Sequence, residues 1–335
     1  MRVLVTGAAG FIGSNVVRTL LQEFEDVDVL GIDSMDSYYD VALKEYRLEG
    51  ISGCDRFEFV KGDITDKTFL NGMFETFRPE YVLHFAAKVG VRHSVERPDE
   101  YVSTNIVGFH NVLESCRIFP VRHLVYASSS SVYGLNSIVP YSVEDRTDSP
   151  VSLYAATKKS NELMAHSYSC LYGIPVTGLR FFTVYGPAGR PDMAYFSFTD
   201  KLAKGGKIRL FNEGECRRDF TYVDDVVEGV MRVLRKPPQG HEGKPACAVY
   251  NVGNGQSVHM TEFVRILKEE LVAAGILPED LDLESCVELA PMQPGDVRVT
   301  CADTDSFERD MGFRPSAPLR DGLRAFAHWY SEYYN

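Results

Sequence analysis

The most constraining feature of the sequence is a short apolar run followed at once by closely spaced glycines. Residues 2–6 read Arg-Val-Leu-Val-Thr, and Gly7, Gly10 and Gly13 follow before a helix-like stretch over residues 14–24. This order predicts a strand, a tight turn and a helix. Glycine permits such a turn and lets the backbone approach a ligand, while unpaired N–H groups at a helix N-terminus attract anions. The segment therefore predicts a site for the pyrophosphate of a dinucleotide.

A second apolar strand, expected over residues 27–32, ends in Asp33 at the usual spacing from Gly13. A carboxylate at this point accepts hydrogen bonds from both ribose hydroxyls of an adenosine and repels a 2′-phosphate. No Arg or Lys lies next to Asp33 in the sequence, which favours NAD over NADP. The alternative is a solvated aspartate at the end of a strand.

Apolar strands continue to alternate with helical stretches along the first two thirds of the chain. Further strands are expected over residues 57–60, 81–85, 123–127, 176–180 and 248–252, with helices over 99–119 and from 154 to 172. Such alternation predicts an α/β fold, a Rossmann-type doubly wound parallel sheet with a smaller mixed α/β substrate-binding domain. We expect residues 1–182 and 222–254 to form the NAD-binding domain, and residues 183–221 and 255–335 to form the substrate domain.

Residues at the expected strand ends are suited to holding a cofactor, because ligands of parallel sheets bind at the carboxyl ends of the strands. Asp63 could hold the amino group of adenine, and capping the next helix is the alternative. Ala86 and Ala87 are small and would let a cofactor lie against the backbone.

Tyr154 and Lys158 are four residues apart in a stretch of good helix formers, so their side chains share one helical face. A free phenol has a pKa of about 10 and is a poor base at neutral pH, but a nearby cation favours the phenolate. The pair suits removal of a hydroxyl proton while a hydride leaves the same carbon. The alternative, a solvated helix face, is common for this spacing taken alone.

Composition excludes several classes of protein. The chain of 335 residues has a formal net charge of −12, which argues against a nucleic-acid or anionic membrane partner. No apolar run approaches the roughly 20 residues needed to span a bilayer. The seven cysteines are scattered, without Cys-x-x-Cys or metal-site spacing, which indicates reduced thiols in a cytoplasmic protein without a metal site.

Taken together, the motifs resemble the extended short-chain dehydrogenase/reductase family, the nucleotide-sugar epimerases and dehydratases. The resemblance covers essentially the whole chain and includes Arg218-Asp-Phe-Thr-Tyr-Val-Asp-Asp225 and Gln293-Pro-Gly-Asp-Val297. It implies tightly bound NAD, with Lys158 holding the nicotinamide ribose and lowering the pKa of Tyr154. The cofactor-binding residues that it implies are Gly7, Gly10, Phe11, Ile12, Gly13, Asp33, Asp63, Ile64, Ala86, Ala87, Lys88, Asn105, Tyr154 and Lys158.

The resemblance also implies a UDP-sugar substrate and a homodimer formed through residues 99–119 and 151–172. Arg218 and Asp296 would lie around the nucleotide diphosphate and ribose, since an Arg fork pairs with two phosphate oxygens. The alternative for Arg218 is a surface ion pair with Asp219 or Asp224.

The run that follows the fifth strand bears on the reaction. In related 4,6-dehydratases it resembles Thr-Asp-Glu, and in UDP-glucuronate decarboxylases Thr-x-Glu; here the corresponding positions are Ser129, Ser130 and Ser131. A hydroxyl relays a proton but is a poor general acid or base for elimination, which disfavours dehydration. This leaves 4-epimerisation, with Ser129 assisting Tyr154. The alternative is a solvent-capped strand end.

A second segment bears on the substrate. Phe181-Phe-Thr-Val-Tyr-Gly-Pro and Gly189-Arg-Pro-Asp-Met-Ala resemble UDP-glucuronate 4-epimerases, whereas epimerases of neutral hexoses tend to carry Asn where Thr183 stands. A uronate carboxylate needs hydroxyl and guanidinium donors. The predicted substrate-binding residues are Arg92, Ser128, Ser129, Ser130, Thr183, Arg190, Met193, Arg218 and Asp296, although Arg92 could instead be solvated.

The sequence therefore predicts an isomerase that interconverts UDP-glucuronate and UDP-galacturonate through a 4-keto intermediate. The alternatives are a UDP-glucose or other UDP-hexose 4-epimerase, a UDP-glucuronate decarboxylase, and a non-catalytic NAD-binding regulator. An intact Tyr154, Lys158 and Ser129 argue against the regulator, because a sensor needs only the cofactor half of the site.

Overall fold

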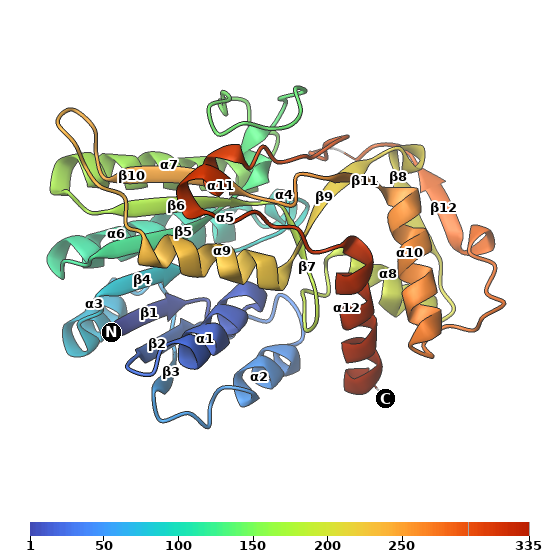
Figure 1. The fold of residues 1–335 in the computed structure, drawn as a ribbon, viewed down its shortest axis with the longest axis horizontal. Coiled ribbons are helices and arrows are strands. Elements are labelled where there is room, and N and C mark those ends of the chain that lie inside the picture. The colour runs from blue at the N-terminus through green and yellow to red at the C-terminus, as the bar shows by residue number, and fades with distance from the viewer. Residues whose placement is uncertain (294, 335) are drawn as a thin grey trace.

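A seven-stranded parallel sheet forms the centre of the larger part of the molecule (Figure 1). In the computed structural model, which describes residues 1–293 and 295–334, its strand order is β10-β6-β5-β4-β1-β2-β3. The strands are β1 (Arg2–Thr6), β2 (Asp28–Asp33), β3 (Phe57–Lys61), β4 (Tyr81–His84), β5 (His123–Ser129), β6 (Val176–Phe181) and β10 (Cys247–Val252). The order runs outward from β1 in both directions, so the predicted doubly wound sheet is confirmed.

Alternate side chains of the strands bury the two faces of the sheet against different helices. Val3 and Val5 pack in a core with α1 (Phe11–Glu23), α9 (Val223–Arg235) and α11 (Asp305–Met311). Leu4, between them, packs in a second core with α3 (Lys67–Phe77), α6 (Phe109–Ile118) and α7 (Leu153–Tyr172). Because successive strand residues point to opposite faces, an all-apolar strand is buried on both sides.

A smaller lobe lies beside the carboxyl ends of these strands (Figure 1). Its sheets are β11-β9-β7 and β12-β8, and Phe220 stacks on Phe263 in its core at 4.5 Å between ring centroids. Leu43 of α2 joins this core, so the lobes share apolar packing. The elements of this lobe are β7 (Thr183–Tyr185), β8 (Ile208–Phe211), β9 (Arg217–Tyr222), β11 (Ser257–His259), β12 (Val287–Ala290), α8 (Ala194–Ala203), α10 (Met260–Ala273) and α12 (Leu319–Tyr334), whereas α2 (Val41–Glu49) lies between β2 and β3 along the chain.

The helical segments expected over residues 99–119 are three joined elements. It comprises α5 (Pro98–Tyr101), the π-helical segment η1 (Val102–Gly108) and α6, with α4 (His93–Glu96) before them. Periodicity alone does not distinguish a π-helical segment from an α-helix, and such segments are frequent at functional sites. The remaining short turns are η2 (Ser130–Tyr133), η3 (Asn212–Gly214) and η4 (Glu284–Cys286).

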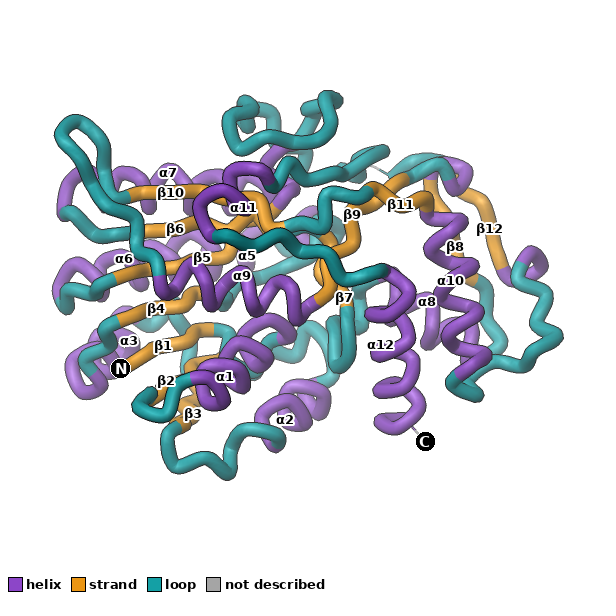
Figure 2. Tube along the Cα trace, viewed as in Figure 1, coloured by secondary structure: helices purple, strands orange, loops and turns teal. Residues whose placement is uncertain are grey.

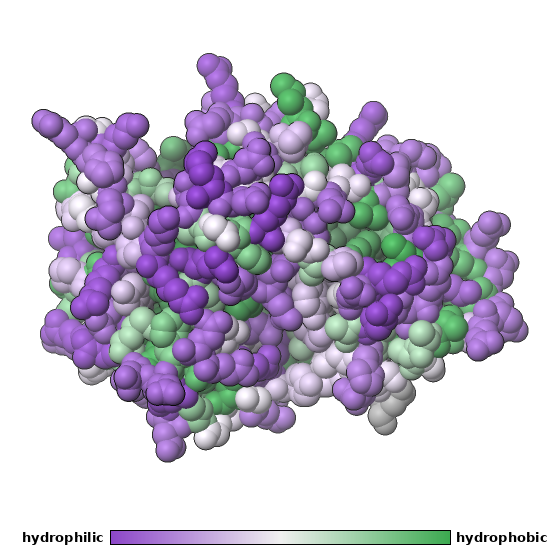
Figure 3. Space-filling view, in the orientation of Figure 1, coloured by the Kyte–Doolittle hydropathy of each residue, from purple (hydrophilic) through white to green (hydrophobic). Residues whose placement is uncertain are grey.

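The surface is hydrophilic over most of the face in Figure 3, with hydrophobic residues in small areas between hydrophilic ones. Figure 2 shows that loops join the elements at both ends of the large sheet, and that the loop between η2 and α7 protrudes from the sheet. Within the described residues, no helix is both long and apolar enough to cross a membrane.

Candidate active site

A cavity of about 740 Å³ opens at the carboxyl ends of the large sheet and extends toward the smaller lobe. Most of the predicted site residues line it. They are Gly7, Gly10, Phe11, Ile12, Gly13, Asp33, Asp63, Ile64, Ala86, Ala87, Lys88, Ser128, Ser129, Tyr154, Lys158, Arg190 and Met193. Six predicted residues lie outside the lining, namely Arg92, Asn105, Ser130, Thr183, Arg218 and Asp296.

The glycine turn between β1 and α1 is packed too tightly for side chains. Gly7 has φ +73°, and a Cβ there would lie 2.7 Å from the main-chain nitrogen of Ala86. A Cβ at Gly13 would lie 2.1 Å from the carbonyl oxygen of Gly7. The first N–H groups of α1 stay open to the cavity because no side chain caps this helix. A closely approached, uncapped N-terminus fits the pyrophosphate of a dinucleotide.

Asp33 lies at the end of β2, and main-chain N–H groups donate a hydrogen bond to each of its two carboxylate oxygens. It accepts hydrogen bonds from the N–H groups of Ala9 (3.2 Å) and Met35 (2.9 Å). The ammonium of Lys44, from α2, lies 3.4 Å from its Oδ1. No Arg or Lys adjoins Asp33 in the sequence, but the fold brings Lys44 next to it, because α2 folds back onto the end of β2. The carboxylate itself lines the cavity, as a ribose ligand should.

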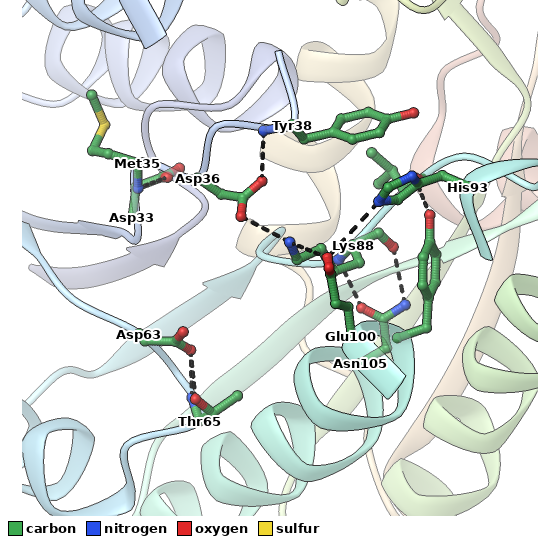
Figure 4. Close-up of polar contacts among 12 residues, drawn as sticks. Asp33, Met35, Asp36, Tyr38, Asp63, Thr65, Lys88, His93, Glu100 and Asn105 are labelled. Atoms are coloured by element: carbon green, nitrogen blue, oxygen red, sulfur yellow. Dashed lines mark hydrogen bonds and ion pairs between the residues drawn. The ribbon is translucent and has the colours of Figure 1, made fainter. Parts of the chain in front are cut away.

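Asp63 accepts hydrogen bonds from the N–H and hydroxyl groups of Thr65 (Figure 4). It does not cap the helix that follows, because Asp66 is the N-cap of α3 and accepts from Phe69. The helix-cap alternative for Asp63 is therefore wrong. Its carboxylate lines the cavity, where adenine binding stays a prediction.

Lys88 lies between two carboxylates that sequence reasoning missed (Figure 4). Its Nζ is 2.8 Å from Asp36, in the segment after β2, and 2.8 Å from Glu100 of α5. Hydrogen bonds with both raise the pKa of Lys88, although its partial burial opposes this. The side chain of Asn105 does not line the cavity but bonds the N–H and C=O of Lys88 at 2.8 and 3.0 Å. Asn105 thus orients Lys88 from the π-helical segment.

Tyr154 and Lys158 lie in the first turns of α7, which Ser152 caps by accepting from Ala155. Lys158 is buried and donates a 2.8 Å bond to the carbonyl of Ala127, and burial lowers its pKa to about 8. Burial raises the pKa of Tyr154, while a hydrogen bond with Ser129 and the charge of Arg190 lower it. Lys158 Nζ is 6.0 Å from the centre of the Tyr154 ring. The solvated-face alternative for this pair is therefore wrong.

Ser129 is poised between a main-chain donor and the phenol. Strand β5 extends two residues further than expected, so Ser129 ends it and its Oγ accepts from the N–H of Ser131 at 3.1 Å. With its oxygen occupied in this way, the hydroxyl is free to donate its proton to the oxygen of Tyr154. A donor to the phenolate favours the ionised form.

The hydroxyl of Ser128, a predicted sugar ligand, donates a 2.7 Å hydrogen bond to the carboxylate of Glu162. Glu162 lies on α7, one turn beyond Lys158, and pairs with Arg180 of β6 through bonds of 2.8 and 2.9 Å. Both charged side chains are buried. Burial alone would raise the pKa of Glu162, but Arg180 and Ser128 outweigh it and hold the pKa below its usual range. This network fixes α7 against the carboxyl end of β5.

Arg190 lies on the cavity wall near Tyr154, but it is not free. Its guanidinium forms two bonds with Asp192, at 3.0 and 2.6 Å, and the Tyr38 hydroxyl reaches the same carboxylate at 3.3 Å. Thr183 begins β7 between two lining residues, Phe182 and Val184. Asp192 belongs to the Gly189-Arg-Pro-Asp-Met-Ala segment, but no role was predicted for it, and Tyr38 lies in no motif with a recognisable spacing.

Arg218 and Asp296, predicted from separate motifs, meet each other. Their closest atoms are 2.6 Å apart, so the alternative pairing of Arg218 with Asp219 or Asp224 is wrong. Residue 294, within the second motif, lies outside the described residues. Asp219 is buried and accepts instead from the N–H groups of Asn254, Gly255 and Ala302.

Arg92 is exposed and stacks over Phe211, 4.8 Å from the ring centre. Its contact is therefore with the smaller lobe. Ser130 begins η2, immediately after Ser129. Elsewhere, no group of three His, Cys, Asp or Glu side chains in the described part of the chain could hold a metal ion.

The fold and the cavity define a class of dinucleotide-dependent enzyme, and comparison with known proteins agrees. Residues 3–253 match the NAD dependent epimerase/dehydratase family, and the chain belongs to that family. The chain is 46% identical to Protein CapI of Staphylococcus aureus, over 100% of this chain and 99% of that protein.

Two further matches are to UDP-glucuronate 4-epimerases. The chain is 46% identical to UDP-glucuronate 4-epimerase 3 of Arabidopsis thaliana, over 99% of this chain and 77% of the relative. The crystal structure of UDP-glucuronic acid 4-epimerase from Bacillus cereus, in complex with UDP-glucuronic acid and NAD, superposes with a TM-score of 0.88. That alignment has 30% identity and covers 100% of both chains.

Proposed function

We propose that the protein is an NAD-dependent UDP-glucuronate 4-epimerase, an isomerase that interconverts UDP-glucuronate and UDP-galacturonate. The observation that carries the proposal is the group of three side chains facing one another at the end of β5. Tyr154 is hydrogen-bonded to Ser129, and the positive charge of Arg190 lies close enough to lower the pKa of its phenol. The proposed substrate half of the site, residues 183–221 and 255–335, contributes Arg190 and Met193 to the same cavity.

The residues present fit the cofactor. Gly7, Gly10 and Gly13 leave room for a pyrophosphate, Asp33 would accept from the adenosine ribose, and Lys158 would hold the nicotinamide ribose. Bound NAD supplies a reversible hydride acceptor for the sugar C4. Everything else in the reaction is proton transfer and positioning by this chain.

Tyr154 takes the proton from the 4-hydroxyl and later returns it. Ser129 would donate a hydrogen bond to the phenolate that forms. The cation of Lys158, 6.0 Å from the centre of the ring, would favour the same negative charge. Epimerisation then requires that the 4-keto sugar present its other face before the hydride returns. Serines at 129–131 offer no carboxylate for eliminating water, so the chemistry ends at C4.

A uronate substrate carries a carboxylate, and the site must keep that carboxylate out of the orientation that leads to loss of CO₂. A 4-keto uronate is a β-keto acid and loses CO₂ when its carboxylate stands perpendicular to the carbonyl plane. Asp192 occupies the Nε and Nη2 groups of Arg190, so the Nη1 side of the guanidinium would donate to that carboxylate, and Thr183 would add a hydroxyl at the start of β7. We infer that this grip separates epimerisation from decarboxylation.

The test is direct. The purified protein is incubated separately with UDP-glucuronate and with UDP-glucose, and products are identified by proton NMR. UDP-galacturonate as the main product from UDP-glucuronate supports the proposal. A UDP-pentose would indicate a decarboxylase, turnover of UDP-glucose alone a hexose epimerase, and no turnover of either sugar a regulator.

A homodimer is the proposed assembly. Large apolar side chains are exposed along the segments expected to form the interface, namely Val102, Val107, Ile118, Leu163, Leu171 and Tyr172. Burying such a patch against a second copy would remove it from water. Light scattering should give twice the chain mass, and Leu163→Glu should give the monomer. A monomeric wild-type protein would exclude this assembly.

We place the protein in the cytoplasm. All seven cysteines are free thiols in the structure, which suits a reducing compartment. Fractionation of cells that express the protein, with blotting of each fraction, tests this assignment.

A further inference from the structure

Arg47 is a buried guanidinium whose charge has no carboxylate partner within residues 1–293 and 295–334. It projects from α2, is 1% exposed and donates four hydrogen bonds. All four acceptors are neutral oxygens. Three are main-chain carbonyls, and the fourth is the hydroxyl of Tyr39, at 2.7 Å. Burying a charge costs free energy unless hydrogen bonds or a counter-charge compensate it, so the four acceptors stabilise Arg47 in this position.

One acceptor, Ala9, belongs to the glycine turn between β1 and α1. Arg47 Nη1 donates to the carbonyl of Ala9 at 3.1 Å, and the N–H of Ala9 donates to Asp33. Ala9 is therefore held from both sides, between Gly7 and Gly10. The bond to Ala9 places the Arg47 cation on the carbonyl side of this turn. The N–H groups of the turn would face a pyrophosphate, and a nearby positive charge favours the binding of that anion.

The other two carbonyls lead directly to Arg190. Arg47 donates to Ala188 at 2.8 Å and to Gly189 at 2.9 Å. Ala188 has φ +51°, an unfavourable conformation for a residue with a side chain, so it needs external support. Replacing Gly189 is prevented too, because a Cβ there would lie 1.7 Å from the hydroxyl of Tyr195.

A second link joins the same two regions. Tyr38, next to Tyr39, donates to Asp192, which in turn holds both arms of Arg190. Burial, with the charge of Asp192, raises the pKa of Tyr38 to about 12, so it remains a phenol donor. Two adjacent tyrosines thus connect the segment after β2 with the loop at residues 188–192.

We propose that Arg47 is a positioning residue that sets the Arg190 loop at a fixed place relative to the dinucleotide turn. The guanidinium of Arg47 bonds Ala9 and the backbone of residues 188–189 at the same time. A shift of the glycine turn at the cofactor end would therefore also shift the Arg190 loop at the sugar end. This inference rests on the proposed function for the role of Arg190, but not for the link itself. The effect on catalysis is indirect, through the geometry of the carboxylate grip.

The test replaces Arg47 by Lys, which keeps the charge but cannot span three carbonyls. The matched control is Arg56→Lys, because Arg56 also donates to three main-chain carbonyls, those of Leu21, Phe24 and Glu25, away from the cavity. The first readout is amide hydrogen exchange of peptides covering residues 186–192 in the NAD-loaded proteins. Exchange should be at least about fivefold faster in Arg47→Lys and unchanged in Arg56→Lys.

The second readout is the product ratio with UDP-glucuronate. Arg47→Lys should lower kcat by about tenfold and raise the UDP-pentose fraction, since a small misplacement of a positioning group lowers the rate strongly. Unchanged exchange at 186–192 overturns the link, whatever the substrate. Faster exchange with an unchanged product ratio overturns the role in the grip. Failure of the wild-type protein to use UDP-glucuronate counts against the proposed function alone, because the exchange readout needs no sugar.

A second variant covers the case in which Arg47→Lys does not fold. Tyr38→Phe removes only the bond to Asp192, with Tyr250→Phe as its control, because Tyr250 makes a similar bond to Asp310 (3.0 Å) away from the cavity. Tyr38→Phe should speed exchange at 186–192 by a smaller factor. Equal exchange in the two phenylalanine variants would contradict the proposal.

Discussion

The ammonium of Lys158 donates a 2.8 Å hydrogen bond to the carbonyl of Ala127, and this bond joins α7 to β5 two residues before Ser129. It places the cation beside the phenol of Tyr154 without a direct bond between them. Because Lys158 is buried, its pKa falls to about 8, within the range where the enzyme can be assayed. The charge that we propose to favour the phenolate is therefore itself sensitive to pH.

Activity should fall on the alkaline side as Lys158 loses its proton, with an apparent pKa near 8 in the profile of kcat/KM. Lys158→Arg should lower the rate but move this limb to higher pH, because a guanidinium keeps its charge. An alkaline limb at the same pH in both proteins would assign the titration to another group. For stability the sign is opposite: the unfolded chain keeps this proton up to about pH 10.5, so this group's contribution rises between about pH 8 and 10.5.

Tyr154→Phe should lose about 10²–10⁴ in kcat, the usual contribution of a positioned acid or base. The fold should survive, because the ring remains and only the hydroxyl that meets Ser129 is lost. Steady-state kinetics and far-ultraviolet circular dichroism measure the two effects. Near-normal turnover by this variant would refute Tyr154 as the proton acceptor.

Arg190→Ala and Thr183→Val should each lower the rate with UDP-glucuronate by about 10–100-fold and increase the UDP-pentose fraction, as lost orientation predicts. The product mixture is followed by NMR. Arg209→Ala is the control, since Arg209 is exposed and pairs with the exposed Glu288. If both site variants kept wild-type rates and products, the carboxylate grip would be wrong as described.

Glu162→Gln should destabilise the fold by about 3–5 kcal/mol, because Arg180 would be left buried without its charged partner. Urea denaturation measures the change. The partly exposed pair Glu228–Arg232 offers the control, and Glu228→Gln should cost no more than about 1 kcal/mol. Since the pKa of Glu162 lies below its usual value, the stability it contributes should be lost as the pH falls below about 4.5. Similar costs for both variants would contradict a special role for the buried pair.

Gly13→Ala should abolish retention of NAD, because its Cβ would collide with the carbonyl of Gly7 at 2.1 Å. Absorbance of the purified protein and release of NAD on denaturation measure the loss. Gly72→Ala is the matched control: Gly72 lies in α3 with open space around it, so alanine should be neutral or stabilise by up to about 1 kcal/mol. Normal NAD content in Gly13→Ala would show that the turn has more room than the structure indicates.

The central sheet and most of the cofactor side were predictable because their information is local. A strand, a glycine turn and a helix are contiguous, and the strand that ends in Asp33 has its own apolar pattern. Helix α7 is similarly evident, with Ser152 before it and Gly173 at φ +68° after it. Strand β9 was missed because Arg217–Tyr222 mixes charged and apolar residues without strict alternation.

Pairings between distant residues were not predictable. Lys44 beside Asp33, Asp36 with Lys88, and Asp192 on Arg190 each depend on how a loop or helix folds back onto the sheet. Ser128 illustrates the point. Its position at the end of β5 followed from the sequence, but its hydroxyl bonds the buried Glu162 because α7 packs there.

The sequence by itself determined the parallel sheet, the phosphate turn and the Tyr154–Lys158 pair, because contiguous periodicity and fixed spacing encode them. Only the tertiary structure decided how the two halves of the site are joined. Arg47 donates to residues 38 and 142 positions away along the chain, and no local pattern marks such contacts. Long-range hydrogen bonds are selected by packing, which places acceptors from separate elements around one buried donor.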